Sequence, residues 1–133
     1  MNGTYTEQLK SGGELRISAK EWTIEYYFPG PDMRYKGTFI RISGKKITEY
    51  IDAWEENFKE YLKLREMMPK DGSFEKRGKM EMTIRVGSRW RDGVCLDSYH
   101  MCIDTEDKIA AIKADYEYAK KRAEQMMEFL SKQ

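Results

Sequence analysis

The spacing of apolar residues changes along the chain and divides it into elements. Apolar and polar residues alternate in Leu15–Ile17 and again in Trp22–Phe28, with a slip in parity near Ala19. Alternation with a period of two predicts β-strands, and the slip predicts a bulge between them. Pro29–Asp32 is rich in turn-forming residues, so we expect the run Met33–Ile42 to return as an antiparallel strand.

This turn predicts the register of the first hairpin. With Phe28 opposite Met33, Trp22 pairs with Phe39 on the apolar face, and Phe39 is therefore expected in the core. The opposite face of the hairpin would then carry Tyr27, Arg34, Lys36 and Ile40.

From about Lys46 the apolar residues recur every three or four positions. They are Ile47, Tyr50, Ile51, Trp54, Phe58, Tyr61 and Leu62. This spacing predicts an amphipathic helix that ends at Met67 or Met68, just before Pro69. The polar, charged segment 69–78 follows and connects the two halves of the chain.

The second half of the chain repeats this plan. Alternation in Met82–Trp90 predicts a strand, and Asp92-Gly93 predicts a two-residue hairpin turn. The return strand reaches Ile103, with Ile84 facing Met101 across the hairpin. The carboxylates within 104–107 suit the start of a helix, whose apolar stripe continues to Leu130.

A shift of 62 residues lays the apolar positions of the first half on those of the second. The aligned pairs are Trp22 with Ile84, Ile24 with Val86, Phe28 with Trp90, Phe39 with Met101, Ile47 with Ile109 and Trp54 with Tyr116. The pattern predicts an internal ββαββα duplication, with halves at about 14–68 and 79–131. The alternative is that any two strand–strand–helix units would align equally well.

Together these elements predict an α+β fold in one domain, residues 1–133. Each helix has one apolar stripe and each hairpin one apolar face, so we expect two layers, with both helices on one face of an antiparallel sheet. The predicted core contains Trp22, Tyr26, Phe39, Trp54, Phe58, Ile84, Val86, Met101, Ile109 and Tyr116.

Composition limits the classes of partner and the cellular location. The 24 basic and 23 acidic residues leave a net charge of +1, which gives no global field to attract nucleic acid or an anionic membrane. The chain has no run of about 18 apolar residues and its first thirty residues carry many charges, so we expect no membrane span, no signal peptide and a cytoplasmic location.

No motif predicts catalysis, a cofactor or a metal site. The two cysteines, Cys95 and Cys102, have neither the number nor the spacing of a disulfide framework or a zinc site. His100 is the only histidine. On one strand face His100 and Cys102 would lie roughly 6–7 Å apart, too far for a hydrogen-bonded nucleophile and base. We therefore expect a protein that is not an enzyme.

The surface feature that stands out is an arginine-rich open sheet face. Residues 76–91 contain six basic side chains and one acidic one, and the aliphatic residues Ile40, Ile42 and Leu96 would share the face. These aliphatics favour a face that is covered by a partner or a second copy of the chain over a merely solvated one. The candidate partner-binding residues are Tyr27, Arg34, Lys36, Arg85, Arg89, Arg91 and His100.

Three classes of function fit these features. The leading hypothesis is a small non-catalytic protein that binds another protein, as an inhibitor or adaptor of the kind that phages and mobile elements encode. The alternative is nucleic-acid or nucleotide binding through the basic face, where stacking and phosphate contacts would act together. An enzyme with an unrecognised site is the third.

Overall fold

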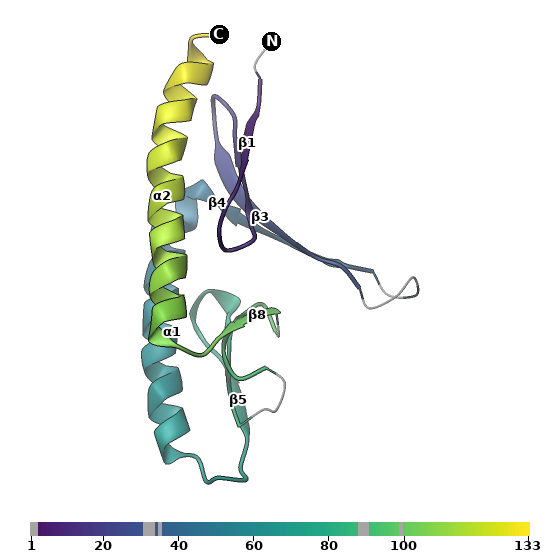
Figure 1. Ribbon diagram of the computed structural model, residues 1–133, viewed down its shortest axis with the longest axis vertical. Helices are drawn as coiled ribbons and strands as arrows, with labels where there is room; N and C mark the ends of the chain where they lie inside the picture. The colour runs from purple at the N-terminus through teal and green to yellow at the C-terminus, as the bar shows by residue number, and fades with distance from the viewer. Residues whose placement is uncertain (1–2, 31–33, 35, 88–90, 99) are drawn as a thin grey trace. The chain divides into compact units, whose positions relative to one another are not determined.

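The computed structural model describes residues 3–30, 34, 36–87, 91–98 and 100–133 (Figure 1). These residues form eight strands and two α-helices, so the predicted α+β class is confirmed. The chain divides into two compact units. Unit 1 is Met1–Ile47 with Ala114–Gln133, and unit 2 is Thr48–Lys113. Each unit contains one four-stranded sheet.

The sheet of unit 1 is an antiparallel meander in the order β1-β2-β3-β4. Its strands are β1 (Tyr5–Gln8), β2 (Glu14–Ile17), β3 (Trp22–Phe28) and β4 (Thr38–Ser43). Leu15 faces Ile24, and Ile24 faces Ile42 on the other side, so three neighbouring strands place a fully buried side chain in one row. This row forms the centre of the unit's core.

The helix that covers this sheet comes from the far end of the sequence. It is the C-terminal part of α2 (Glu106–Ser131), whose residues from Ala114 onwards belong to unit 1. Tyr26 on β3 donates a hydrogen bond to Tyr116 on α2, with 3.2 Å between the hydroxyl oxygens, and both side chains are buried. The backbone N–H of Ser11 donates to the carboxylate of Asp115. The sheet of the first half is thus covered by the helix of the second half.

Unit 2 combines the other sheet with α1 (Ile47–Met67), of which all but the first residue belongs to this unit. The strands, in the order β5-β6-β7-β8, are β5 (Phe74–Arg77), β6 (Thr83–Val86), β7 (Gly93–Leu96) and β8 (His100–Ile103). Trp54 and Ile84 lie in the core. The Asn57 side chain on α1 donates to the carbonyl of Lys79 and accepts from its N–H, which fixes the connection between β5 and β6.

The strands form two sheets rather than the single sheet predicted. β1, β5 and β7 were not predicted as separate strands. β1 and β5 have the sequences Tyr-Thr-Glu-Gln and Phe-Glu-Lys-Arg, which lack the apolar alternation that reveals a strand. Both lie at a sheet edge, where a strand is paired on one side only and short, charged sequences are common.

The register predicted for the first hairpin is wrong. Phe28 pairs with Thr38 and Tyr26 with Ile40, because the connection between the strands is longer than a tight turn. The difference of five residues is odd, and an odd shift turns every side chain of the returning strand to the other face. Phe39 is therefore exposed and Ile42 is buried, the reverse of the prediction. The pairings predicted for Met33 and Tyr35 lie outside the described residues.

The register predicted for the second hairpin is also wrong. Gly93 is the first residue of β7 and pairs with Arg85, so Ile84 faces Val94 instead of Met101. Leu96, predicted on the open face, is buried. The remainder of the predicted core is buried apart from Trp22 and Met101, which are half-buried, and Phe39. The pairings predicted for Trp90 and Tyr99 fall outside the described part of the chain.

Both helices have the predicted boundaries. α1 ends at Met67, before Pro69, and α2 begins at Glu106, where the Thr105 hydroxyl accepts from the N–H of Lys108. The two halves are consistent with a duplication in which four strands precede each helix. The 62-residue offset pairs β3 with β6 and β4 with β8, so β7 has no counterpart at that offset.

A disulfide joins Cys95 to Cys102, which the sequence analysis did not predict. The two residues are directly paired on β7 and β8, with their Cα atoms 3.9 Å apart. The predicted hairpin had placed Cys95 opposite Trp90. Only the additional strand β7 brings the two cysteines together.

Candidate functional site

The predicted partner-binding residues lie on two different sheets. Tyr27 is on β3, and Arg34 and Lys36 are in the β3–β4 connection, all in unit 1. The residues of unit 2 are Arg85 on β6, Arg91 before β7 and His100 on β8. Arg89 lies outside the described residues. The structure thus separates the predicted set into two groups, each of which has its own surroundings.

Arg85 and His100 of the unit 2 group are sheltered and paired within the unit, whereas Arg91 is exposed. Arg85 is paired in register with Glu75 on β5, and their side chains form an ion pair of 3.0 Å. Only 23% of the Arg85 side chain is exposed. His100 lies 3.5 Å from the carboxylate of Asp97 and pairs with the buried Leu96. Neither residue projects as an accessible anchor for a partner.

The basic segment that begins at Lys76 is matched by carboxylates. Lys76 forms an ion pair of 3.3 Å with Glu60 of α1, and Lys79 pairs with Glu56 one helical turn earlier. These four side chains also line a hollow of about 410 Å³ in unit 2. Because its ammonium groups already face carboxylates, this hollow is poorly suited to a phosphate.

In unit 1 the outer face of the sheet is the face opposite the buried row. Its residues, read from the strand registers, are Thr6, Gln8, Glu14, Arg16, Thr23, Glu25, Tyr27, Phe39, Arg41 and Ser43. Two arginines and two glutamates give this face no net charge. The face is polar near β1 and β2 and aromatic at the far end of β3 and β4.

The aromatic end of this face is a cross-strand pair with a cation beside it. Tyr27 and Phe39 are paired in register, and 64% and 54% of their surfaces are exposed. The guanidinium carbon of Arg41 lies 5.7 Å from the centre of the Phe39 ring, in cation–π range. We call Tyr27, Phe39 and Arg41 the hairpin face.

At the base of the hairpin face, the largely buried carboxylate of Glu25 forms ion pairs with two arginines. Only 12% of the Glu25 side chain is exposed, and it lies between Arg16 at 3.5 Å and Arg41 at 3.8 Å. The hydroxyl of Thr23 donates to the same carboxylate, at 3.1 Å. These groups border a shallow hollow of about 230 Å³ beside Trp22. Glu25, together with Glu14 at 3.1 Å from Arg16, therefore balances the charges of the two arginines.

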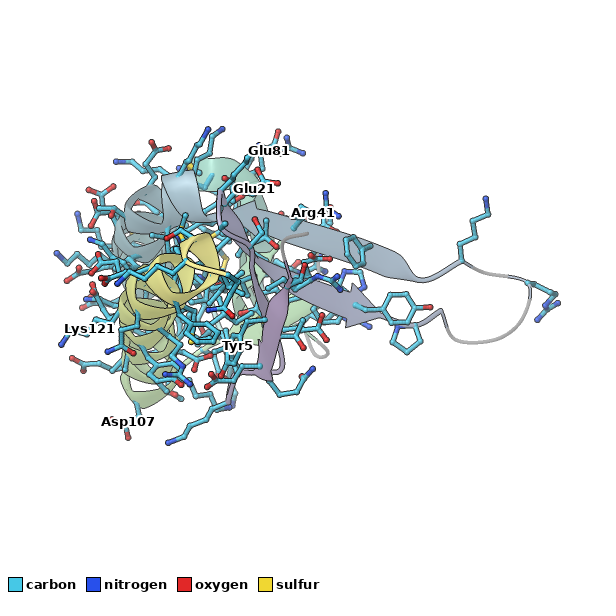
Figure 2. All side chains as sticks on the ribbon, turned by 90° about the horizontal axis from the view of Figure 1, so that it is seen from above. Tyr5, Glu21, Arg41, Glu81, Asp107 and Lys121 are labelled. Atoms are coloured by element: carbon cyan, nitrogen blue, oxygen red, sulfur yellow. A yellow bond between two sulfur atoms is a disulfide. The ribbon has the colours of Figure 1, made fainter. Side chains whose placement is uncertain are left out.

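The hairpin face lies on a two-stranded extension of the sheet. β2 pairs with β3 only as far as Glu25, so Tyr26–Phe28 and Thr38–Ile40 continue without cover from β2. Figure 2 shows this hairpin projecting from the rest of unit 1, with Arg41 on β4 near its base. Arg34 and Lys36, at its far end, are exposed.

Sequence analysis identified Tyr27 of this face and missed Phe39 and Arg41. Phe39 was assigned to the core because of the register error, and Arg41 was not considered as a candidate. Its neighbours carry a usable signal: with Ile42 and Ile40 as the inward residues, the alternation of Phe39 and Arg41 marks an outward row.

Elsewhere in unit 1, the most densely bonded carboxylate is Glu7. It accepts hydrogen bonds from the hydroxyls of Tyr118 and Tyr5 and from Arg122. The hydrogen bond from Tyr118, with those from Tyr5 and Arg122, lowers the pKa of Glu7. This cluster joins β1 to α2 and accounts for the shifted pKa by itself, so we assign it to docking of the helix on the sheet.

Among the described residues, no group of three or more histidine, cysteine, aspartate or glutamate side chains could hold a metal ion. Neither helix, over the residues described, is apolar over a length that could cross a membrane. Comparison of the chain with protein-family models, curated proteins and solved structures finds no match.

Proposed function

We propose that the protein is a small non-catalytic binding protein that contacts another protein through the hairpin face. Tyrosine and arginine are the residues that most often dominate the binding energy of protein interfaces, at well-packed centres surrounded by polar residues. Tyr27, Phe39 and Arg41 form such a centre, with Glu25, Thr23 and Arg16 around it. The exposed aromatic pair is the observation that carries the proposal.

The electrostatics favour a protein partner over nucleic acid. Phosphate binding needs basic side chains that are free to replace the counterions of the nucleic acid, whereas Arg16 and Arg41 both pair with Glu25. A neutral face with an apolar centre and a polar rim suits a protein surface. By covering a surface of its partner, the protein would act as an inhibitor or adaptor. We propose the cytoplasm as its location, where Cys95 and Cys102 would be present as a reduced thiol pair rather than as the disulfide.

The decisive test compares capture of partners by matched variants. Tyr27→Ala with Phe39→Ala removes the aromatic pair. Phe129→Ala is the control, because Phe129 is as exposed as Phe39, each at 54%, and lies on α2. We expect wild type and the Phe129 variant to retain the same protein from nuclease-treated host extract, and the double variant to lose it.

The outcome that contradicts the proposal is equal retention by all three proteins. Nucleic-acid binding would show itself differently, because affinity for single-stranded or duplex probes would then fall steeply with salt and Lys36→Glu would weaken it. Unchanged thermal unfolding of the double variant shows that its loss of binding does not result from unfolding, since both rings are largely exposed.

A further inference from the structure

The four sheet edges formed by the described residues differ in how they are protected. They are β1 and β4 in unit 1 and β5 and β8 in unit 2. An open edge presents unpaired backbone groups and tends to pair with another chain. Natural proteins block such edges with short strands, charged side chains, prolines or irregular backbone.

Three of the four edges carry such features. β1 has four residues and an inward-pointing charge, Glu7, which is bonded to α2. β5 has four residues, three of them charged. β8 has four residues, an irregular register opposite Cys95 and Leu96, and a left-handed residue, Met101, with φ 55°. Each of these edges is a poor template for a further strand.

β4 has none of these protections. It has six residues, Thr-Phe-Ile-Arg-Ile-Ser, rich in β-forming types and with a single charge. Its pairing with β3 is regular from Thr38 to Ser43, and within the described part of the chain β3 is its one strand neighbour. Apolar residues lie accessible on both faces, Phe39 on the outer and the half-buried Ile40 on the inner.

We propose that β4 pairs antiparallel with β4 of a second copy of the chain, with Ile40 on the two-fold axis. In this register each Phe39 lies opposite Arg41 of the other copy, and the two Ile40 side chains meet on the inner face. Thr38 lies opposite Ile42. The unit 1 sheets of the two copies then form one continuous sheet of eight strands, and β4 is no longer an edge strand in either copy.

Charge and aromatic complementarity select this register over its neighbours. A two-fold axis at Arg41 would place the two guanidinium groups opposite each other, which is unfavourable. An axis at Phe39 would leave Arg41 opposite Gly37, beyond the end of the strand. Only the axis at Ile40 repeats between copies the cation–π contact that Arg41 and Phe39 make within one chain.

The inference shares Phe39 and Arg41 with the hairpin face, but its distinguishing element is the backbone edge of β4, which the proposed function does not use. Two variants separate them. Ile40→Lys places a charge on the dimer axis, pointing to the inner face, and leaves the hairpin face in place. Tyr27→Ala removes half of the aromatic pair and lies on β3, away from the edge.

The test is self-association measured by sedimentation velocity from micromolar to millimolar concentration, together with backbone amide exchange. We expect the dimer fraction to rise with concentration, and amides of β4 to exchange more slowly as it does. Ile40→Lys should be monomeric throughout the range, while Tyr27→Ala should dimerise as wild type does. Thr6→Lys, an exposed change on the opposite edge strand β1, is the matched control and should also dimerise.

A monomer at every concentration would overturn the proposal, as would a dimer whose β4 amides gain no protection. Protection of β4 that requires a different protein would assign the edge to that partner instead. If Ile40→Lys proves unfolded by circular dichroism, the concentration dependence of amide exchange in the wild-type chain still decides.

Discussion

At the scale of single residues, the Asp92 side chain holds two elements together by hydrogen bonds, rather than forming the tight turn that the sequence predicts. Its carboxylate accepts from the hydroxyl of Tyr61 at 2.8 Å and from the N–H of Gly87 at 2.9 Å. It thereby ties the approach to β7 both to α1 and to the end of β6. Sequence analysis read Asp92 as one half of a two-residue hairpin turn, because Asp-Gly is the commonest signal for one.

This hydrogen bond predicts a change in stability at high pH. Burial, together with the hydrogen bond to Asp92, raises the pKa of Tyr61 from 10.0 to about 12. A raised pKa in the folded state means that the stabilisation is fully present below pH 10 and is lost as the pH rises towards about 12. Denaturant unfolding of wild type should therefore lose more stability across this window than Tyr61→Phe does.

The difference between the two proteins isolates Tyr61 from the other tyrosines, which titrate in both. Tyr61→Phe should itself cost roughly 1–3 kcal/mol at neutral pH, because it leaves a carboxylate without its hydroxyl donor. Parallel stability curves from neutral pH to pH 12 would show that the pKa of Tyr61 is not raised in the folded state.

At the scale of elements, the pairing of β5 with β6 changes the meaning of Arg85. On a bare outer face, reversing its charge would leave the fold intact. Its registered partner is Glu75, and the buried part of its side chain includes the Nε atom, which has no hydrogen-bond partner among the described residues. We therefore regard Arg85 as part of the sheet rather than as a binding residue.

Charge reversal tests this assignment. Arg85→Glu places two carboxylates directly opposite each other on adjacent strands, and we expect it to lower the free energy of unfolding by about 1 kcal/mol or more. Adding Glu75→Lys restores opposite charges and should recover much of the loss in thermal melts. If Arg85→Glu has the same melting temperature as wild type, Arg85 is a solvated residue and returns to the set of candidate binding residues.

At the scale of the whole molecule, neither unit pairs a sheet with the helix that directly follows it in the sequence. The strands of unit 1 precede α1 in the sequence, yet their core contains Tyr116, Ala119 and Ala123 of α2. Unit 2 contains α1 and the strands that come after it. The halves of the sequence pattern are therefore not the units that fold around a common core.

Fragments distinguish these two divisions of the chain. Residues 48–113 contain the sheet and helix α1 of unit 2, so this fragment should fold and show dispersed amide resonances. Residues 1–68 contain the sheet of unit 1 without α2 and should remain largely unfolded, since Leu15, Ile24 and Ile42 would lose their cover. A folded 1–68 and an unfolded 48–113 would support the repeat as the folding unit.

Sequence alone determined the helices, the α+β class and the presence of strand-rich halves. Helix boundaries are encoded locally: Pro69 prevents continuation of α1, and Thr105 caps α2. The apolar stripes around Trp54 and Tyr116 identify the buried helix faces, because burial of a helix requires that spacing.

The tertiary structure decided the strand registers, the number of sheets and the candidate site. Strand pairing depends on residues distant in sequence, and a shift by an odd number exchanges the two faces of a strand at once. This exchange of faces explains why Phe39 lies on the hairpin face rather than in the predicted core. Arg85 lies in an ion pair within its sheet because the unpredicted strand β5 places Glu75 opposite it. Which helix covers which sheet is equally a matter of long-range packing, because both helices present an apolar stripe that could cover either one.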